Sequence, residues 1–338
     1  MRILIVCNAG RNIGFGHLSR SLVIAKELRD YLQVNVEIIV SGDEINHPEL
    51  NLFEHTFLSL DKDLIETIFK KIQAKQPNII IFDLSPQFTP SSLDRLLIYL
   101  KMCKIKIIGV DSIVEFGAYL DLLFIPSILF EKSDKIPVST PIMMGWDCFL
   151  LKSDIEPSPW YPGNKVLILT GGSDVAGIGN TLPAKLDRAL PEGSEIHWVI
   201  GPYAQLPHLP ESPRLNIIIH NAPPNLNKLM TEVNYALTVF GVSFFELLYY
   251  GIPTVVFSPY GSRDDAYLKK IKHENVAMIA KDEDDAILKL NELMNSNSLA
   301  MSLSNHARQK LAVNGTKKFI SAIKMLVDSE NNNSGKNK

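Results

Sequence analysis

Strand-length apolar runs alternate with helical segments along most of the chain, and this alternation constrains the fold more than any other feature. The runs are almost continuously apolar, which is typical of parallel strands that are covered on both faces. In the first half they lie at ILIVC (3–7), VEIIVS (36–41), NIIIFD (78–83), KIKIIGVD (104–111) and DLLFIP (121–126). The helical spacing of apolar residues predicts helices between the runs, at 17–30, 61–75 and 90–102.

The pattern stops at SDIEPSPWYPGN (153–164) and then starts again. This segment carries three prolines and a glycine, which is typical of a linker. Beyond it the sequence predicts strands at 165–170, 195–201, 215–221, 235–240, 254–259 and 276–280, and a final helix at 298–327. We therefore expect two Rossmann-like α/β domains with parallel sheets, at 1–152 and 165–328, which face a cleft. The polar tail at 329–338 is predicted to be disordered.

The composition argues against several classes of protein. With 338 residues, 46% of them hydrophobic, the chain is long enough for two cores. A net charge of −3 and the lack of a basic stripe argue against nucleic acid as a partner. The three cysteines (Cys7, Cys103 and Cys148) lie far apart and suggest neither a disulfide framework nor a zinc site. No segment reads as a signal peptide or a membrane span, so we expect a cytoplasmic protein without stable membrane insertion.

The first candidate site follows the opening strand, at GFGH (14–17). In doubly wound sheets, ligands bind beyond the carboxyl ends of the strands. Gly14 and Gly16 allow a tight bend there and leave His17 near the start of the next helix, where the helix dipole disfavours imidazolium. A neutral imidazole can accept a proton from water, and Arg20 lies one turn further along the same face. The alternative is a turn histidine that only caps or packs.

The second candidate is the loop LILTGGSD (167–174). Gly171, Gly172 and Ser173 offer bare backbone N–H groups after a strand, which suits a diphosphate. The loop is neither a Walker loop nor a complete dinucleotide fingerprint, and a plain turn accounts for it equally well. Pro183 predicts that the next helix starts near Thr181.

The third candidate is VFGVSFFELLYYGIP (239–253), in which Gly241 ends a strand. Ser243 and Glu246 have the spacing of a capping box, which predicts a structural role for the glutamate. A fixed carboxylate also suits the two hydroxyls of a ribose, so a nucleotide-binding role for Glu246 stays equally open.

Other acidic residues are weaker candidates. Asp83 and Asp111 each end a predicted strand, so both are minor candidates for the same site. The runs DKD (61–63) and DEDD (282–285) look like metal motifs, but acids favour helix N-termini and we predict helix starts there. The seven other histidines show no spacing typical of metal ligands.

The segments GFGHLSR, TGGSD and GVSFFELLYYGIP, together with GWDCFLLKSD (145–154), resemble the nucleotide-sugar hydrolases of pseudaminic acid biosynthesis. The resemblance extends from Met1 to about Leu326. Those enzymes cleave a UDP-activated diacetamido-trideoxy sugar to UDP and free sugar, and they share the GT-B fold with MurG-type UDP-sugar glycosyltransferases. The resemblance implies that this chain has the GT-B fold and needs neither metal nor cofactor.

Carried over residue by residue, the resemblance makes His17 the base that activates water, in a loop shaped by Gly14 and Gly16. It places the diphosphate on the second loop and the ribose on Glu246. The remaining substrate-binding candidates are Arg20, Gly171, Gly172, Ser173, Gly241 and Ser243.

The sequence departs from this family at three places. VCNAGRN stands where the family has an arginine and an aspartate, and Asp83-Leu84-Ser85 stands for Asp-His-Tyr. Asp264 and Asp265 stand for an Asn-Gln pair near the sugar, which makes Asp265 a further minor candidate. A glycosyltransferase that uses an acceptor hydroxyl in place of water therefore remains the main alternative. A UDP-sugar epimerase and a binding module without chemistry are also open.

Overall fold

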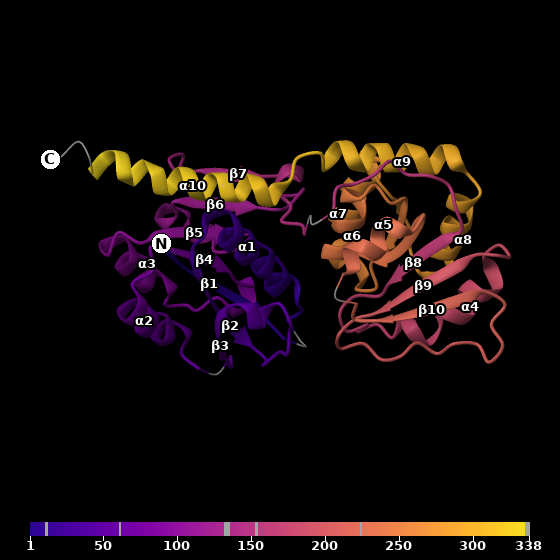
Figure 1. The fold of residues 1–338 in the computed structure, drawn as a ribbon, viewed down its shortest axis with the longest axis horizontal. Coiled ribbons are helices and arrows are strands. Elements are labelled where there is room, and N and C mark those ends of the chain that lie inside the picture. The colour runs from indigo at the N-terminus through magenta and orange to yellow at the C-terminus, as the bar shows by residue number, and fades with distance from the viewer. Residues whose placement is uncertain (11–12, 61, 132–135, 153–154, 224, 335–338) are drawn as a thin grey trace. The chain divides into compact units, whose positions relative to one another are not determined.

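The structure is a computed structural model that describes residues 1–10, 13–60, 62–131, 136–152, 155–223 and 225–334. The chain forms two compact units (Figure 1). Unit 1 consists of Met1–Leu151 and Val313–Lys338, and unit 2 of Lys152–Ala312. Each unit is built around one parallel sheet with helices, so the predicted pair of α/β domains is confirmed.

Unit 1 has a seven-stranded sheet in the order β3-β2-β1-β4-β5-β6-β7. Its strands are β1 (Arg2–Ala9), β2 (Asn35–Gly42), β3 (Glu54–Leu58), β4 (Ile79–Asp83), β5 (Lys106–Val110), β6 (Leu122–Ile125) and β7 (Ile142–Met144). Its helices are α1 (Gly16–Leu32), α2 (Leu64–Lys75), α3 (Leu93–Met102) and α10 (Gly315–Ser334). The central strands are buried along nearly their whole length, as their continuous apolar runs predict.

Unit 2 has a six-stranded sheet in the order β10-β9-β8-β11-β12-β13. Its strands are β8 (Lys165–Leu169), β9 (Glu195–Ile200), β10 (Asn216–Asn221), β11 (Tyr235–Val239), β12 (Thr254–Phe257) and β13 (Met278–Ile279). Its helices are α4 (Leu182–Ala189), α5 (Leu226–Glu232), α6 (Val242–Tyr249), α7 (Asp265–Glu274), α8 (Glu283–Met294) and α9 (Asn297–Lys310). In both sheets the order reverses beside the first strand, which is the point where doubly wound sheets bind ligands.

The C-terminal region differs from the sequence prediction. The single helix expected at 298–327 is two helices, α9 and α10, and the second belongs to unit 1. The fully buried Phe319 packs edge-on against Phe124 of β6, with ring centroids 4.9 Å apart. The apolar face of α10 is therefore part of the unit 1 core. The helix continues to Ser334, into the predicted tail, and 335–338 lie outside the described residues.

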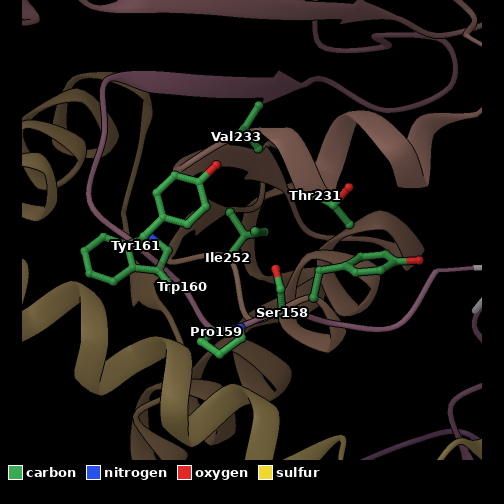
Figure 2. A pocket seen from close by; sticks show the side chains of 8 residues that line it. Ser158, Pro159, Trp160, Tyr161, Thr231, Val233 and Ile252 are labelled. Atoms are coloured by element: carbon green, nitrogen blue, oxygen red, sulfur yellow. The ribbon is translucent and has the colours of Figure 1, made fainter.

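The expected linker packs against unit 2 over its described part, 155–164. The Trp160 indole N–H donates to the Asn234 carbonyl at 2.7 Å, and the Trp160 ring meets Tyr235. Figure 2 shows the small hollow beside this segment, lined by residues such as Ser158 and Ile252. Its volume of about 10 Å³ is that of a single water, so it is no substrate site.

Two strands of unit 1 are missing from the sequence prediction. β3 is half-buried and begins with polar residues, and β7 is apolar but only three residues long, so neither forms an apolar run of strand length. Both lie at the edges of the sheet. Over the described residues, no helix is both long enough and apolar enough to cross a membrane.

Candidate active site and nucleotide loops

Two side chains from neighbouring strand ends meet in unit 1. His17 lies in the first turn of α1, and Asp83 is the last residue of β4. Because β1 and β4 are paired, with Cys7 opposite Asp83, the loop that follows β1 lies beside the end of β4. His17 Nδ1 is 2.7 Å from Asp83 Oδ1. The sheet register therefore brings together two residues that are 66 positions apart.

His17 Nδ1 also lies 3.2 Å from Arg20 Nη2, which can only donate, but its contact with the Asp83 carboxylate is 0.5 Å shorter. This shorter contact assigns the proton of the neutral imidazole to Nδ1, which donates to Asp83. His17 Nε2 is then the basic nitrogen, and no described residue bonds to it. The His17 side chain is 22% exposed, while that of Asp83 is fully buried. A buried carboxylate that orients a partly exposed imidazole is an arrangement suited to general-base catalysis.

Arg20 holds the carboxylate in place. Its Nε donates to Asp83 Oδ2 at 2.8 Å and its Nη2 to Asp83 Oδ1 at 2.6 Å, a bidentate pair. Burial by itself would raise the pKa of Asp83, but the charge and hydrogen bonds of Arg20 and the His17 contact hold that pKa below its ordinary value. Asp83 is therefore an ionised partner for His17 at neutral pH.

A second carboxylate reaches the same guanidinium. Arg20 Nη1 donates to Asp111 Oδ2 at 3.1 Å, and Asp111 directly follows β5. The side chain of Asp111 is 37% exposed, unlike that of Asp83. The two minor candidates thus join the two main ones, and the four residues form a cluster that we call the His17 cluster: His17, Arg20, Asp83 and Asp111.

The loop before His17 is closed by its glycines. The Gly14 N–H donates to the Gly10 carbonyl at 2.8 Å, and Gly14 has a φ of +91° that favours glycine. Gly16 is the first residue of α1. Both predicted glycines therefore lie in the turn that places His17, while 11–12 lie outside the described residues.

Asn8, which lies in none of the three sequence motifs, also supports this site. Its Oδ1 accepts from the Ser85 N–H at 2.9 Å, and its Nδ2 donates to the Ser41 carbonyl at 3.2 Å. It thus joins the loop that follows β4 to the end of β2. An asparagine that interrupts an apolar strand, as in ILIVCNAG, is the signal that could have revealed it.

The second group of predicted residues lies in unit 2. Gly171, Gly172 and Ser173 follow β8, and the Tyr203 N–H donates to the Gly172 carbonyl at 2.9 Å, which joins this loop to the loop after β9. No described residue accepts a hydrogen bond from the backbone N–H of these three residues. Gly171 has a φ of +90°. The loop therefore presents free donors of the kind that bind a diphosphate.

Glu246 lies in the next loop-helix segment, since β11 pairs with β8. The predicted capping box is wrong: α6 begins at Val242 with Gly241 as its N-cap, so Ser243 is already inside the first turn. Burial raises the pKa of Glu246 to about 7, and the Ser243 hydroxyl and the Lys152 charge oppose this only in part. Capping therefore does not account for the half-buried Glu246 carboxylate, and of the two roles predicted for it, nucleotide binding is the one that stays open.

The remaining acidic candidates have structural roles or lie exposed. Asp63 and Asp282 cap α2 and α8 and accept from Glu66 and Asp285 N–H groups, which confirms the predicted helix starts. Asp265 is exposed at the first position of α7. In the part of the chain that the structure describes, no group of three His, Cys, Asp or Glu side chains is arranged to hold a metal.

The structure thus divides the predicted residues into two sets, one per unit. Gly14, Gly16, His17 and Arg20 lie together in unit 1. The other set follows neighbouring strands of unit 2 and consists of Gly171, Gly172, Ser173, Gly241, Ser243 and Glu246. Lys152, whose charge acts on Glu246, lies in the segment GWDCFLLKSD, but nothing in that segment marked the lysine as part of the site.

No protein-family model matches the sequence, and no curated protein matches it. Solved structures do match over nearly the whole chain. MurG of Acinetobacter baumannii has a TM-score of 0.64 at 15% identity, covering 96% of this chain and 100% of its own.

Two further structures extend the comparison. The glycotransferase of kitacinnamycin has a TM-score of 0.65 at 16% identity, covering 96% of this chain and 98% of its own. A UDP-GlcNAc 2-epimerase from Neisseria meningitidis, bound to UDP-GlcNAc, has a TM-score of 0.58 at 12% identity, covering 96% and 99%. At these identities the match shows architecture alone. The chain has the GT-B fold, with two parallel-sheet α/β domains of seven and six strands.

Proposed function

We propose that the protein is an enzyme that hydrolyses a UDP-activated sugar to UDP and free sugar, with His17 as the base. The observation that carries the proposal is the 2.7 Å contact of His17 Nδ1 with the buried Asp83 carboxylate. This contact leaves His17 Nε2 as a basic nitrogen on a partly exposed ring. The resemblance of the sequence to pseudaminic-acid-pathway hydrolases supports a 2,4-diacetamido-trideoxy sugar as the substrate.

Unit 2 would bind the nucleotide. The free N–H groups of Gly171, Gly172 and Ser173 suit the diphosphate, and the Glu246 carboxylate suits the hydroxyls of the ribose. Gly241 and Ser243 would line the same nucleotide, because their segment follows the strand beside β8. Four of the similar solved structures hold UDP or a UDP-sugar, which supports this class of ligand.

Unit 1 would supply the base. His17 Nε2 takes a proton from water as the water oxygen forms a bond to the anomeric carbon. The bond from that carbon to the β-phosphate oxygen breaks, and its electron pair leaves with UDP. Asp83 stabilises the imidazolium that forms, and backbone donors stabilise the negative charge on the diphosphate. UDP is a good leaving group, so no second acidic residue is needed.

Mass spectrometry in ¹⁸O water tests the proposal. The purified protein would be incubated with a panel of UDP-sugars that includes 2,4-diacetamido-trideoxy sugars, without any acceptor. We expect equal amounts of UDP and free sugar, with the label on the anomeric oxygen. UDP-sugar that is bound and returned intact would contradict hydrolysis.

Glycosyl transfer is the second candidate, and the fold match to MurG and to another glycotransferase favours it. The His17–Asp83 pair would then deprotonate an acceptor hydroxyl. Tight UDP-sugar binding without release of free sugar, followed by turnover when alcohols are added, would identify a transferase. A change in sugar configuration with UDP still attached would instead identify an epimerase.

A further inference from the structure

The turn that follows β5 holds its backbone in an unusual conformation. Asp111 has a φ of +53° and Ile113 a φ of +49°, although neither is glycine. A β-branched residue is rarely found in this left-handed region. Such conformations persist only where the surrounding structure imposes them, and they cluster at functional sites.

Hydrogen bonds from the core impose this turn. The Asp111 N–H donates to the Phe124 carbonyl at 2.9 Å, and the buried Ser112 hydroxyl donates to the Phe82 carbonyl at 3.0 Å. These bonds tie the turn to β6 and β4, the strands on either side of β5. The fold therefore fixes the position of the Asp111 side chain at the carboxyl edge of the sheet.

This position places a surplus carboxylate in the His17 cluster. Asp83 already neutralises Arg20 through two hydrogen bonds, and it is fully buried. Asp111 contributes a single contact, from Arg20 Nη1 to Oδ2, and its Oδ1 has no partner among the described residues. Desolvation raises the pKa of Asp111, and the charge of Asp83 adds to this against the opposing charge of Arg20. The carboxylate is thus poorly compensated and 37% exposed.

We infer that Asp111 is a specificity-determining residue, whose free carboxylate oxygen accepts a hydrogen bond from a hydroxyl or acetamido N–H group of the sugar. An ionised carboxylate accepts hydrogen bonds from neutral hydroxyl and N–H groups, whereas it would repel an acidic sugar. The inference rests on the proposed function, since it assigns the sugar of the substrate to the His17 cluster. It does not make Asp111 a proton donor or acceptor in the reaction.

Isothermal calorimetry in the non-hydrolysing His17→Asn background tests the inference. The ligands are UDP and the UDP-sugar of the panel that the His17→Asn protein binds most tightly. Adding Asp111→Asn should weaken UDP-sugar binding about 10- to 100-fold and change UDP binding less than twofold. Asp94→Asn, at an exposed position of α3, is the matched control and should change neither.

A second variant separates binding from folding. Asp111→Gly removes the carboxylate and relieves the positive φ, so it should lose sugar affinity without a lower Tm. An unchanged ratio of UDP-sugar to UDP affinity in both variants would overturn the role of Asp111. If the His17→Asn protein bound UDP-sugar no better than UDP, Asp111 would have no sugar to recognise and the inference would fall. If wild-type protein bound neither ligand, the proposed function would fall with it.

Discussion

At the scale of single residues, the chemistry of the site depends on keeping Asp83 charged inside the protein. A buried carboxylate is costly unless it is paired, and here Arg20 and His17 pair it on both oxygens. The same pairing fixes which nitrogen of His17 is basic. In the proposed reaction, Asp83 would therefore act through His17, as a positioning residue.

Asp83→Asn tests this positioning role. The amide cannot stabilise an imidazolium as the carboxylate does, so kcat should fall about 10²- to 10⁴-fold with little change in UDP affinity. Asp121→Asn is the control, because Asp121 accepts hydrogen bonds from Lys101 and the Ile107 N–H elsewhere in unit 1. Equal losses of activity in the two variants would point to a general loss of stability instead.

Glu246 gives a prediction about pH. With its pKa raised to about 7, the glutamate of the free protein is largely protonated below that pH. Ribose hydroxyls donate best to the ionised form, so UDP affinity should fall as pH drops below 7, by up to about tenfold per pH unit. Calorimetry in buffers of different ionisation enthalpy should show that UDP binding releases a proton.

Glu246→Gln is the control for this pH dependence. It keeps the titration of the diphosphate but loses that of the glutamate, so the remaining pH dependence of UDP affinity should be weaker.

The raised pKa of Glu246 also means that folding favours the protonated form. The stability that protonation contributes is full below pH 4.5 and is lost as pH rises through about 7. Glu246→Gln has no such pH-dependent loss. The difference in free energy of unfolding between Glu246→Gln and wild type should therefore shift in favour of the variant by about 1–3 kcal/mol from pH 5 to pH 8.

At the scale of secondary-structure elements, the strands with continuous apolar runs were predictable and the others were not. ILIVC and KVLILT are recognisable because burial on both faces requires apolar residues at every position. β3 (EHTFL) and β7 (IMM) lie at sheet edges, where one strand neighbour is missing and polar or short sequences suffice. Spacing alone also misplaced the cap of α6, because it cannot distinguish an N-cap serine from one in the first turn.

The helix α10 could not be assigned to unit 1 from sequence, because its apolar face predicts burial but not the partner. Phe319→Ala tests that packing. Phe319 is fully buried against Phe124, so the substitution should lower the free energy of unfolding of unit 1 by about 3–5 kcal/mol. Met325→Ala, at a side chain that is 71% exposed on the same helix, should change it by less than about 0.5 kcal/mol. Similar effects of both substitutions in urea unfolding would show that α10 is not docked.

At the scale of the whole molecule, the chain builds unit 1, then all of unit 2, and returns to finish unit 1 with α10. The candidate residues could be named from three motifs at strand ends, because parallel strands place their following loops at one edge of each sheet. Their partners could not, since Asn8, Lys152 and the Arg20 contacts depend on register and packing. The proposed division of roles between the units gives a further prediction.

Hydrogen exchange should separate the two roles. UDP alone should protect the loop after β8 and the start of α6, because both would contact the nucleotide. A UDP-sugar, added to His17→Asn protein to prevent turnover, should extend protection to the segment at the start of α1. Protection of that segment by UDP alone, with no change in unit 2, would contradict this division.

The central claim is that His17 removes a proton from water during UDP-sugar hydrolysis. The most direct test measures the rate of UDP release by His17→Asn against His273→Asn, which makes the same substitution at an exposed position of α7. We predict that His17→Asn loses at least about 10²-fold in kcat while it still binds UDP with wild-type affinity, and that His273→Asn is unchanged. Wild-type turnover by His17→Asn would contradict the assignment of the base and the mechanism built on it.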